Sequence, residues 1–137
     1  MKTRHPTPKD IQELLAFLPA ISAPDFVALK EWRRGPPTAE GLLPFPYTIY
    51  DPLLQEFIEV INKPCWMDYD YGAHPVVLHG PPPDFPANAD LPTLRAALSK
   101  CVRVDRFCDG ALGDSFDSGL IRLMLERLAE LNAQGAL

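Results

Sequence analysis

Several features that would reveal a function directly are missing from this sequence. It has no C-x-x-C pair, no glycine-rich phosphate loop, no G-x-S-x-G and no H-E-x-x-H, so these zinc, nucleotide and hydrolase motifs are absent. No uninterrupted run approaches the roughly 18 apolar residues of a membrane-spanning helix, and the first residues lack the apolar core of a secretory signal. We therefore expect a cytoplasmic protein that uses neither a membrane nor a cofactor.

Positive charge and cysteine are also scarce. Thirteen Lys and Arg stand against 18 Asp and Glu, which gives a net charge of −5. Binding to nucleic acid or to an anionic membrane without sequence preference requires a basic surface, so we expect neither partner. Of the three cysteines, Cys101 and Cys108 would lie about 10 Å apart along one helix, beyond the reach of a disulfide. Free thiols fit the reducing cytoplasm.

Proline, in contrast, is abundant. Twelve of the 16 prolines lie between residues 36 and 92, and none follows. This stretch is acidic as well, because residues 40–92 contain eight Asp and Glu but a single Lys. A chain of 137 residues that is 47% hydrophobic can build one compact domain. We predict a single, mainly α domain over residues 1–137 with about five helices; its parts are a helical segment at 7–34, an acidic, proline-rich, coil-rich middle at 36–92 and a helical segment at 93–134.

The expected helix starts share one pattern, in which a capping Ser, Thr or Asp stands just before a proline. The side chain accepts a hydrogen bond from the first turn, where proline is tolerated. Each start is followed by apolar residues at helical spacing. The helices predicted in this way cover residues 8–18, 24–34, 52–62 and 91–107; residues 44–50 are expected to be extended, Val76–Leu78 to form a short strand or buried coil, and Asp114 or Ser115 to cap the final helix.

The final helix has the clearest periodicity. Its apolar residues recur at helical spacing and predict a stripe that packs against the helix of residues 91–107. Leu123 falls on the opposite, charged face. A leucine among charges can anchor a contact between two copies, so one interpretation is a homodimer, although a single exposed leucine is also common without any function. The predicted buried stripe is Ile121, Met124, Leu125, Leu128 and Leu131.

Two arginines form a candidate binding group. Arg103 and Arg106 are three residues apart and lie on nearly the same side of a helix. Two adjacent guanidinium groups repel each other and attract carboxylates or an anionic ligand. The candidate counter-ions are Asp68, Asp70 and Asp109. The arginines therefore either bind a small phosphate or carboxylate ligand or hold the fold together through ion pairs.

An aromatic and acidic segment at residues 65–72 is a candidate contact surface. Trp66 and Tyr69 stand beside Asp68 and Asp70, a composition found at protein interfaces. The same composition suits a proline-rich segment that wraps around a helical core. The predicted ligand or partner surface joins this segment to the arginines and comprises Trp66, Asp68, Tyr69, Asp70, Arg103, Arg106 and Asp109.

The run Arg103-Val104-Asp105-Arg106-Phe107-Cys108-Asp109-Gly110 resembles the marker segment of a bacterial and archaeal domain family of unknown function, Arg-x-x-Arg-Phe-Cys-(Asp/Glu)-Gly. The helix after Gly119 and the segment Cys65–Tyr69 are similar to further parts of that family. The resemblance extends over about residues 50–130. It implies a helical fold and no particular activity.

We interpret the chain as a small soluble interaction or ligand-binding module, whose partner is an unidentified protein or a small anionic ligand. No catalytic machinery is evident, and whether the protein is an enzyme stays open. One alternative is a small metal-dependent hydrolase or nucleotide-processing enzyme, with the arginines on phosphate and Asp68, Asp70 or Asp109 on the metal. Another is an inhibitor or immunity-type protein that binds through its acidic surface.

Overall fold

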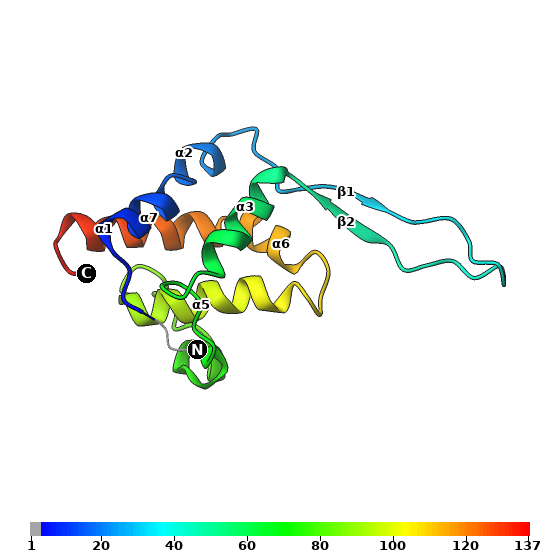
Figure 1. Cartoon of the computed structure of the whole chain (residues 1–137). Coiled ribbons are helices and arrows are strands. Elements are labelled where there is room, and N and C mark those ends of the chain that lie inside the picture. The colour runs from blue at the N-terminus through cyan, green and yellow to red at the C-terminus, as the bar shows by residue number, and fades with distance from the viewer. Residues whose placement is uncertain (1–3) are drawn as a thin grey trace.

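The computed structural model describes residues 4–137, and the fold is mainly α, as predicted. The helices gather into one body, and a long β-hairpin projects from it (Figure 1). In chain order the elements are α1 (Pro8–Leu15), α2 (Leu18–Ile21), β1 (Leu29–Arg33), β2 (Tyr47–Tyr50), α3 (Pro52–Ile61), a 3-10 turn (Tyr71–Ala73), α4 (Pro75–Leu78), α5 (Leu91–Val104), α6 (Ala111–Asp117) and α7 (Leu120–Ala133).

Three helices begin where the sequence predicted, and for the predicted reason. The Thr7 hydroxyl accepts from the Asp10 N–H (3.2 Å), while the Asp10 carboxylate accepts from the Thr7 N–H (2.8 Å), which completes a capping box at α1. The Asp51 and Asp90 carboxylates likewise accept from backbone N–H groups at the starts of α3 and α5. These caps satisfy donors that have no partner within the helix.

The core lies where α7 meets α1, α2, α5 and α6. The predicted stripe of α7 is its buried face, and Leu123 is exposed on the other side, as predicted. Phe57 of α3 makes edge-to-face contacts with Phe17 and with Phe116 of α6. The hydrophobic core therefore holds the helical body together and leaves most of the hairpin outside it.

The predicted helix at residues 24–34 is wrong. Leu29–Arg33 form β1, which pairs antiparallel with β2, with Leu29 opposite Tyr50 and Arg33 opposite Tyr47. The segment expected to be extended, residues 44–50, contains β2, which is the partner strand of β1. Pairing satisfies the backbone N–H and C=O groups of both segments. The pairing with a distant strand therefore prevails over the local start signal for a helix.

Residues Val76–Leu78 also differ from the prediction, because they belong to the short helix α4 and not to a strand or coil. The His74 ring Nδ1 accepts from the Val76 N–H (3.2 Å) and caps this helix. Pro75 occupies its first turn, where its missing N–H has no cost.

The turn between α5 and α7 contains a further helix, α6. It places Asp114 and Ser115 inside a helix and not at the start of the final one, and α5 ends at Val104 rather than near Phe107. Gly110 and Gly119 precede α6 and α7 with φ values of 97° and 89°, a conformation that favours glycine. These two glycines divide the C-terminal segment into three helices.

Candidate functional site

The hairpin is the most unusual feature of the molecule, and we call residues 29–50 the arm. Only β1 and β2 are paired, and residues 34–46 extend beyond them (Figure 1). The outer turn is closed by two hydrogen bonds between Thr38 and Leu42, and the Arg34 side chain donates to the Pro44 carbonyl (2.7 Å) across the arm. A two-stranded hairpin is marginal in water by itself. Its defined position therefore depends on its attachment to the body.

Carboxylates of the helical body hold the base of the arm. Asp109 accepts from the Thr48 N–H (3.1 Å) and from the Thr48 hydroxyl (2.7 Å). Asp117 accepts from the Ala28 N–H (2.9 Å) at the start of β1. Each carboxylate thus accepts a hydrogen bond from a backbone N–H at the base of the hairpin.

A third carboxylate binds the tyrosine at the end of β2. The Tyr50 hydroxyl donates to Asp105 Oδ1 (2.7 Å) and accepts from the Gly113 N–H (3.3 Å), and Asp105 Oδ1 also accepts from the Leu112 N–H (3.1 Å). Burial and the hydrogen bond to Asp105 raise the pKa of Tyr50 to about 12. The contact between Tyr50 and the body therefore requires the neutral, protonated phenol.

We expect Tyr50 to ionise late when the folded protein is titrated with base. Its pKa is about 12 in the folded protein against an ordinary value of 10.0. The stability that the neutral phenol contributes is therefore complete below about pH 10 and is lost as the pH rises towards 12. The absorbance of tyrosinate measures this step. The last part of the absorbance rise should disappear in Tyr50→Phe and persist in Tyr69→Phe; an unchanged curve in Tyr50→Phe would contradict the contact.

Two glycines let the arm lie directly on the body. A Cβ at Gly113 would stand 2.8 Å from Tyr50 Cε1, and one at Gly110 would stand 3.0 Å from Trp32 Cζ2. Both distances are shorter than carbon atoms tolerate without movement. We call the five residues beneath the arm the anchor: Asp105, Asp109, Gly110, Gly113 and Asp117.

The part of the arm beyond the anchor is apolar and exposed. Phe45 is 94% exposed, Leu42 66% and Leu43 62%. Trp32 and Tyr47 are about half exposed on the paired strands. Single exposed apolar residues are common, but a contiguous apolar surface usually marks an interaction site.

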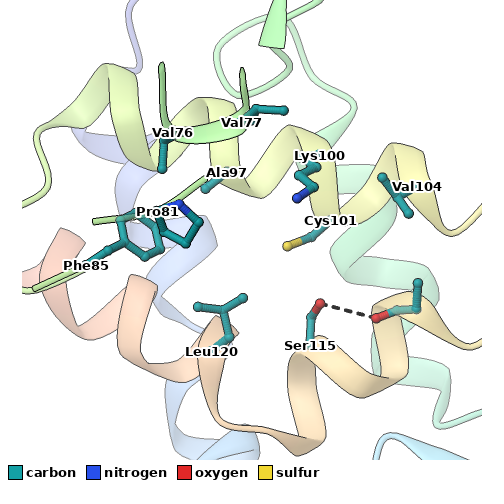
Figure 2. Close-up of a pocket in the computed structure, with 11 residues that line it drawn as sticks. Val76, Val77, Pro81, Phe85, Ala97, Lys100, Cys101, Val104, Ser115 and Leu120 are labelled. Atoms are coloured by element: carbon teal, nitrogen blue, oxygen red, sulfur yellow. Dashed lines mark hydrogen bonds between the residues drawn. The ribbon is translucent and has the colours of Figure 1, made fainter. Parts of the chain in front are cut away.

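The body contains an apolar pocket between α4, α5, α6 and the start of α7 (Figure 2). Its volume is about 180 Å³. Lys100 and Cys101 line it from α5, and the Ser115 hydroxyl at its edge donates to the Ala111 carbonyl (3.2 Å). The apolar part of its lining includes Val76, Val77, Phe85, Ala97, Val104 and Leu120.

The arginines predicted as a binding group do not contact their predicted counter-ions. Within residues 4–137, neither Arg103 nor Arg106 forms a side-chain hydrogen bond or an ion pair. Asp109 instead binds Thr48 of the arm. Arg106 is exposed, and Arg103 is half-buried at the end of α5. The predicted ion-pair network is therefore replaced by carboxylate contacts to the arm.

The predicted aromatic and acidic surface is divided. Trp66 is fully buried, so it belongs to the core, whereas Tyr69 and Asp70 are exposed. The Asp68 N–H donates to the Ser99 hydroxyl of α5 (2.8 Å), which fixes this segment against the middle of that helix. Asp109 lies at the base of the arm instead. The structure thus separates the seven predicted residues. Trp66 lies in the core, Asp109 lies in the anchor, and the other five lie on the surface of the body with partial or full exposure.

Sequence reasoning missed the arm, although one signal was present. Leu42, Leu43 and Phe45 stand among prolines and a glycine, where no helix can bury them. Apolar residues in such a segment must be covered by a distant part of the fold or stay exposed. The acceptor role of Asp105 had no such signal, because its partner Tyr50 is distant in sequence.

Three further observations concern metal ligands, thiols and membrane-spanning helices. Among residues 4–137, no group of three or more His, Cys, Asp or Glu side chains could hold a metal ion. Cys65 is buried, Cys101 half-buried and Cys108 exposed, and each is a free thiol. No helix in the described part of the chain is long and apolar enough to cross a membrane.

Comparison with known proteins gives one match, which is to a family model. Neither the search of curated proteins nor that of solved structures gave a match. One family model matches residues 6–134, a range that contains the arm, the anchor and the pocket. The chain therefore belongs to that family, which is described as Family of unknown function (DUF6508).

Proposed function

We propose that this chain is a protein-interaction module that contacts its partner with the arm. The observation that carries the proposal is the 94% exposure of Phe45 on a hairpin that projects from the helical body (Figure 1). Burying such a side chain against a partner stabilises a complex by about 1.5–3 kcal/mol. Aromatic side chains are also the residues that most often dominate binding energies at interfaces.

The construction of the arm favours binding, because it reduces the conformational entropy that association would remove. Pro44 and Pro46 flank Phe45 and restrict its backbone. The anchor fixes the base of the arm through Asp105, Asp109 and Asp117. A binding element that is ordered before it meets its partner loses less freedom on binding.

The residues predicted from the sequence take secondary roles in this proposal. Asp109 acts by holding the arm and not by touching a ligand. Tyr69, Asp70, Arg103 and Arg106 extend the contact surface on the body, and the two arginines supply cations for acidic groups of the partner. Trp66 supports the segment from within the core.

A photo-crosslinker at position 45 tests the proposal. We would replace Phe45 by p-benzoylphenylalanine in cells from which the chain comes, and identify any adduct by mass spectrometry. Leu123 of α7 is the matched control position, since it is 42% exposed but lies outside the proposed contact surface. We expect an adduct of defined mass from position 45 and none from position 123.

The identified partner would then be purified and its affinity for the chain measured. Phe45→Ser should weaken binding ten-fold or more, and Leu123→Ser should leave it within two-fold. If position 45 gives no more adduct than position 123, or if Phe45→Ser binds normally, the arm is not the contact element.

A further inference from the structure

The apolar pocket has the size of one aromatic side chain. Its volume of about 180 Å³ is below the roughly 300–1,000 Å³ of sites that enclose drug-sized ligands. Apolar protein cavities of roughly 150 Å³ bind benzene, which has the dimensions of a phenylalanine ring. The pocket thus matches a single inserted side chain better than a metabolite.

The composition of the pocket favours an aromatic occupant in particular. Val76, Ala97 and Leu120 supply apolar walls, and Phe85 offers a ring for an edge-to-face contact. Lys100 lines the same space from α5 and has no ion pair within residues 4–137 (Figure 2). A lysine ammonium beside an aromatic face is attracted to it, and an aliphatic side chain offers no such interaction.

From these observations, and resting on the proposed function of the arm, we infer that the partner is a second copy of this chain. In the dimer, Phe45 of each copy inserts into the pocket between α4, α5 and α6 of the other. The same two elements then meet twice around a two-fold axis, which closes the assembly at two copies. The chain itself supplies both the exposed ring and the cavity of matching size.

The geometry of the arm requires that the pocket belong to another copy. The anchor holds Tyr50, and five extended residues place Phe45 about 16 Å further out. The arm leads away from the helical body (Figure 1), and Phe45 is 94% exposed, so it does not fill the pocket of its own chain. A projection of this length spans a little under half the body of a neighbour, whose diameter for such a chain is about 37 Å.

Charge complementarity supports contact between the arm of one copy and the body of another. Residues 29–50 contain Lys30, Arg33 and Arg34 against two Glu, for a net charge of +1, while the rest of the chain carries −6. The segment 73–92 beside the pocket contains Asp84 and Asp90 and no Lys or Arg. Lys30 pairs with Asp51 and Arg33 with Glu31, whereas Arg34 has no ion pair within residues 4–137. Arg34 is therefore the cation of the arm that can meet Asp84 or Asp90 of a second copy.

Sedimentation velocity with two complementary variants tests the inference. Phe45→Ser removes the inserted ring, and Ala97→Leu fills the pocket. We expect the wild-type chain to sediment as a dimer and each variant to have a dimer dissociation constant at least ten-fold higher. An equimolar mixture of the two variants should form a heterodimer, because one intact ring then meets one intact pocket. Circular dichroism melts confirm that each variant is folded.

The Cys101 thiol gives a second measurement, because it lines the pocket while Cys108 is exposed elsewhere. With a thiol-reactive probe, Cys101 should react at least ten-fold faster in Phe45→Ser than in the wild-type dimer, and Cys108 should react equally in both. This readout also covers the case in which Ala97→Leu fails to fold.

A wild-type monomer at all concentrations tested, a dimer that Phe45→Ser leaves intact, or no heterodimer from two folded variants would overturn the inference. The crosslinking experiment separates this failure from failure of the proposed function. An adduct between position 45 and a different protein would support the arm as a contact element and overturn the inference that the partner is a second copy. An adduct of two identical chains supports both.

Discussion

Phe57→Ala should lower the free energy of unfolding by about 3–5 kcal/mol, the largest effect we expect from a single substitution. Phe57 is fully buried, and its ring meets Phe17 at 5.6 Å and Phe116 at 4.9 Å between centroids, with interplanar angles of 76° and 80°. Such edge-to-face pairs add about 0.5–1.5 kcal/mol to the effect of burial. Truncation therefore removes both the buried area and the contacts that join α3 to α6.

Urea unfolding followed by circular dichroism measures this loss, provided that the slope of the transition is unchanged. Phe107→Ala is the matched control, since Phe107 is 82% exposed and should change stability by at most about 0.5 kcal/mol. A loss below about 1 kcal/mol for Phe57→Ala would show that α3 does not pack in the core as described.

Asp105→Ala should lower the free energy of unfolding by about 1–3 kcal/mol and loosen the arm. Its Oδ1 accepts from both the Tyr50 hydroxyl (2.7 Å) and the Leu112 N–H (3.1 Å), and Leu112 is fully buried. Removal of the carboxylate leaves a buried N–H without an acceptor, which has a cost of that size. Limited proteolysis should then cleave the arm faster than in the wild-type protein.

A double-mutant cycle separates the two partners of Asp105. The effects of Asp105→Ala and Tyr50→Phe should be non-additive, with a coupling energy of at least about 0.5 kcal/mol, because both remove the same hydrogen bond. Tyr69→Phe serves as the control for loss of a phenol hydroxyl, since Tyr69 is half exposed. Asp105→Asn, which retains an oxygen acceptor, should be the milder change. Additive effects would mean that Tyr50 and Asp105 do not act together.

These contacts explain why the segment from Arg103 to Gly110 matters to the fold. Its Asp105 and Asp109 bind the arm, and its Gly110 admits the Trp32 ring. The two arginines of the same segment, Arg103 and Arg106, form no ion pair within residues 4–137. In this segment, the acidic residues and the glycine hold the arm against the body.

The sequence by itself determined where α1, α3 and α5 begin and which face of α7 is buried. Helix caps and apolar stripes involve residues three or four apart, so the capping box at Thr7 and the buried stripe of α7 are readable from the order of residues. The exposure of Leu123 follows from the same period. Local interactions fix these features, and local patterns predict them.

Only the tertiary structure decided that residues 29–50 form a hairpin and where this hairpin lies on the body. Whether Leu29–Arg33 form a helix or a strand depends on pairing with Tyr47–Tyr50, and the position of that hairpin depends on Asp105, Asp109 and Gly113 more than 50 residues away. Hydrogen bonds and close approaches between such distant residues leave no periodic trace in the sequence. The candidate site arises from these long-range contacts, whereas the prediction from the sequence rested on side chains that share one helix or one short segment.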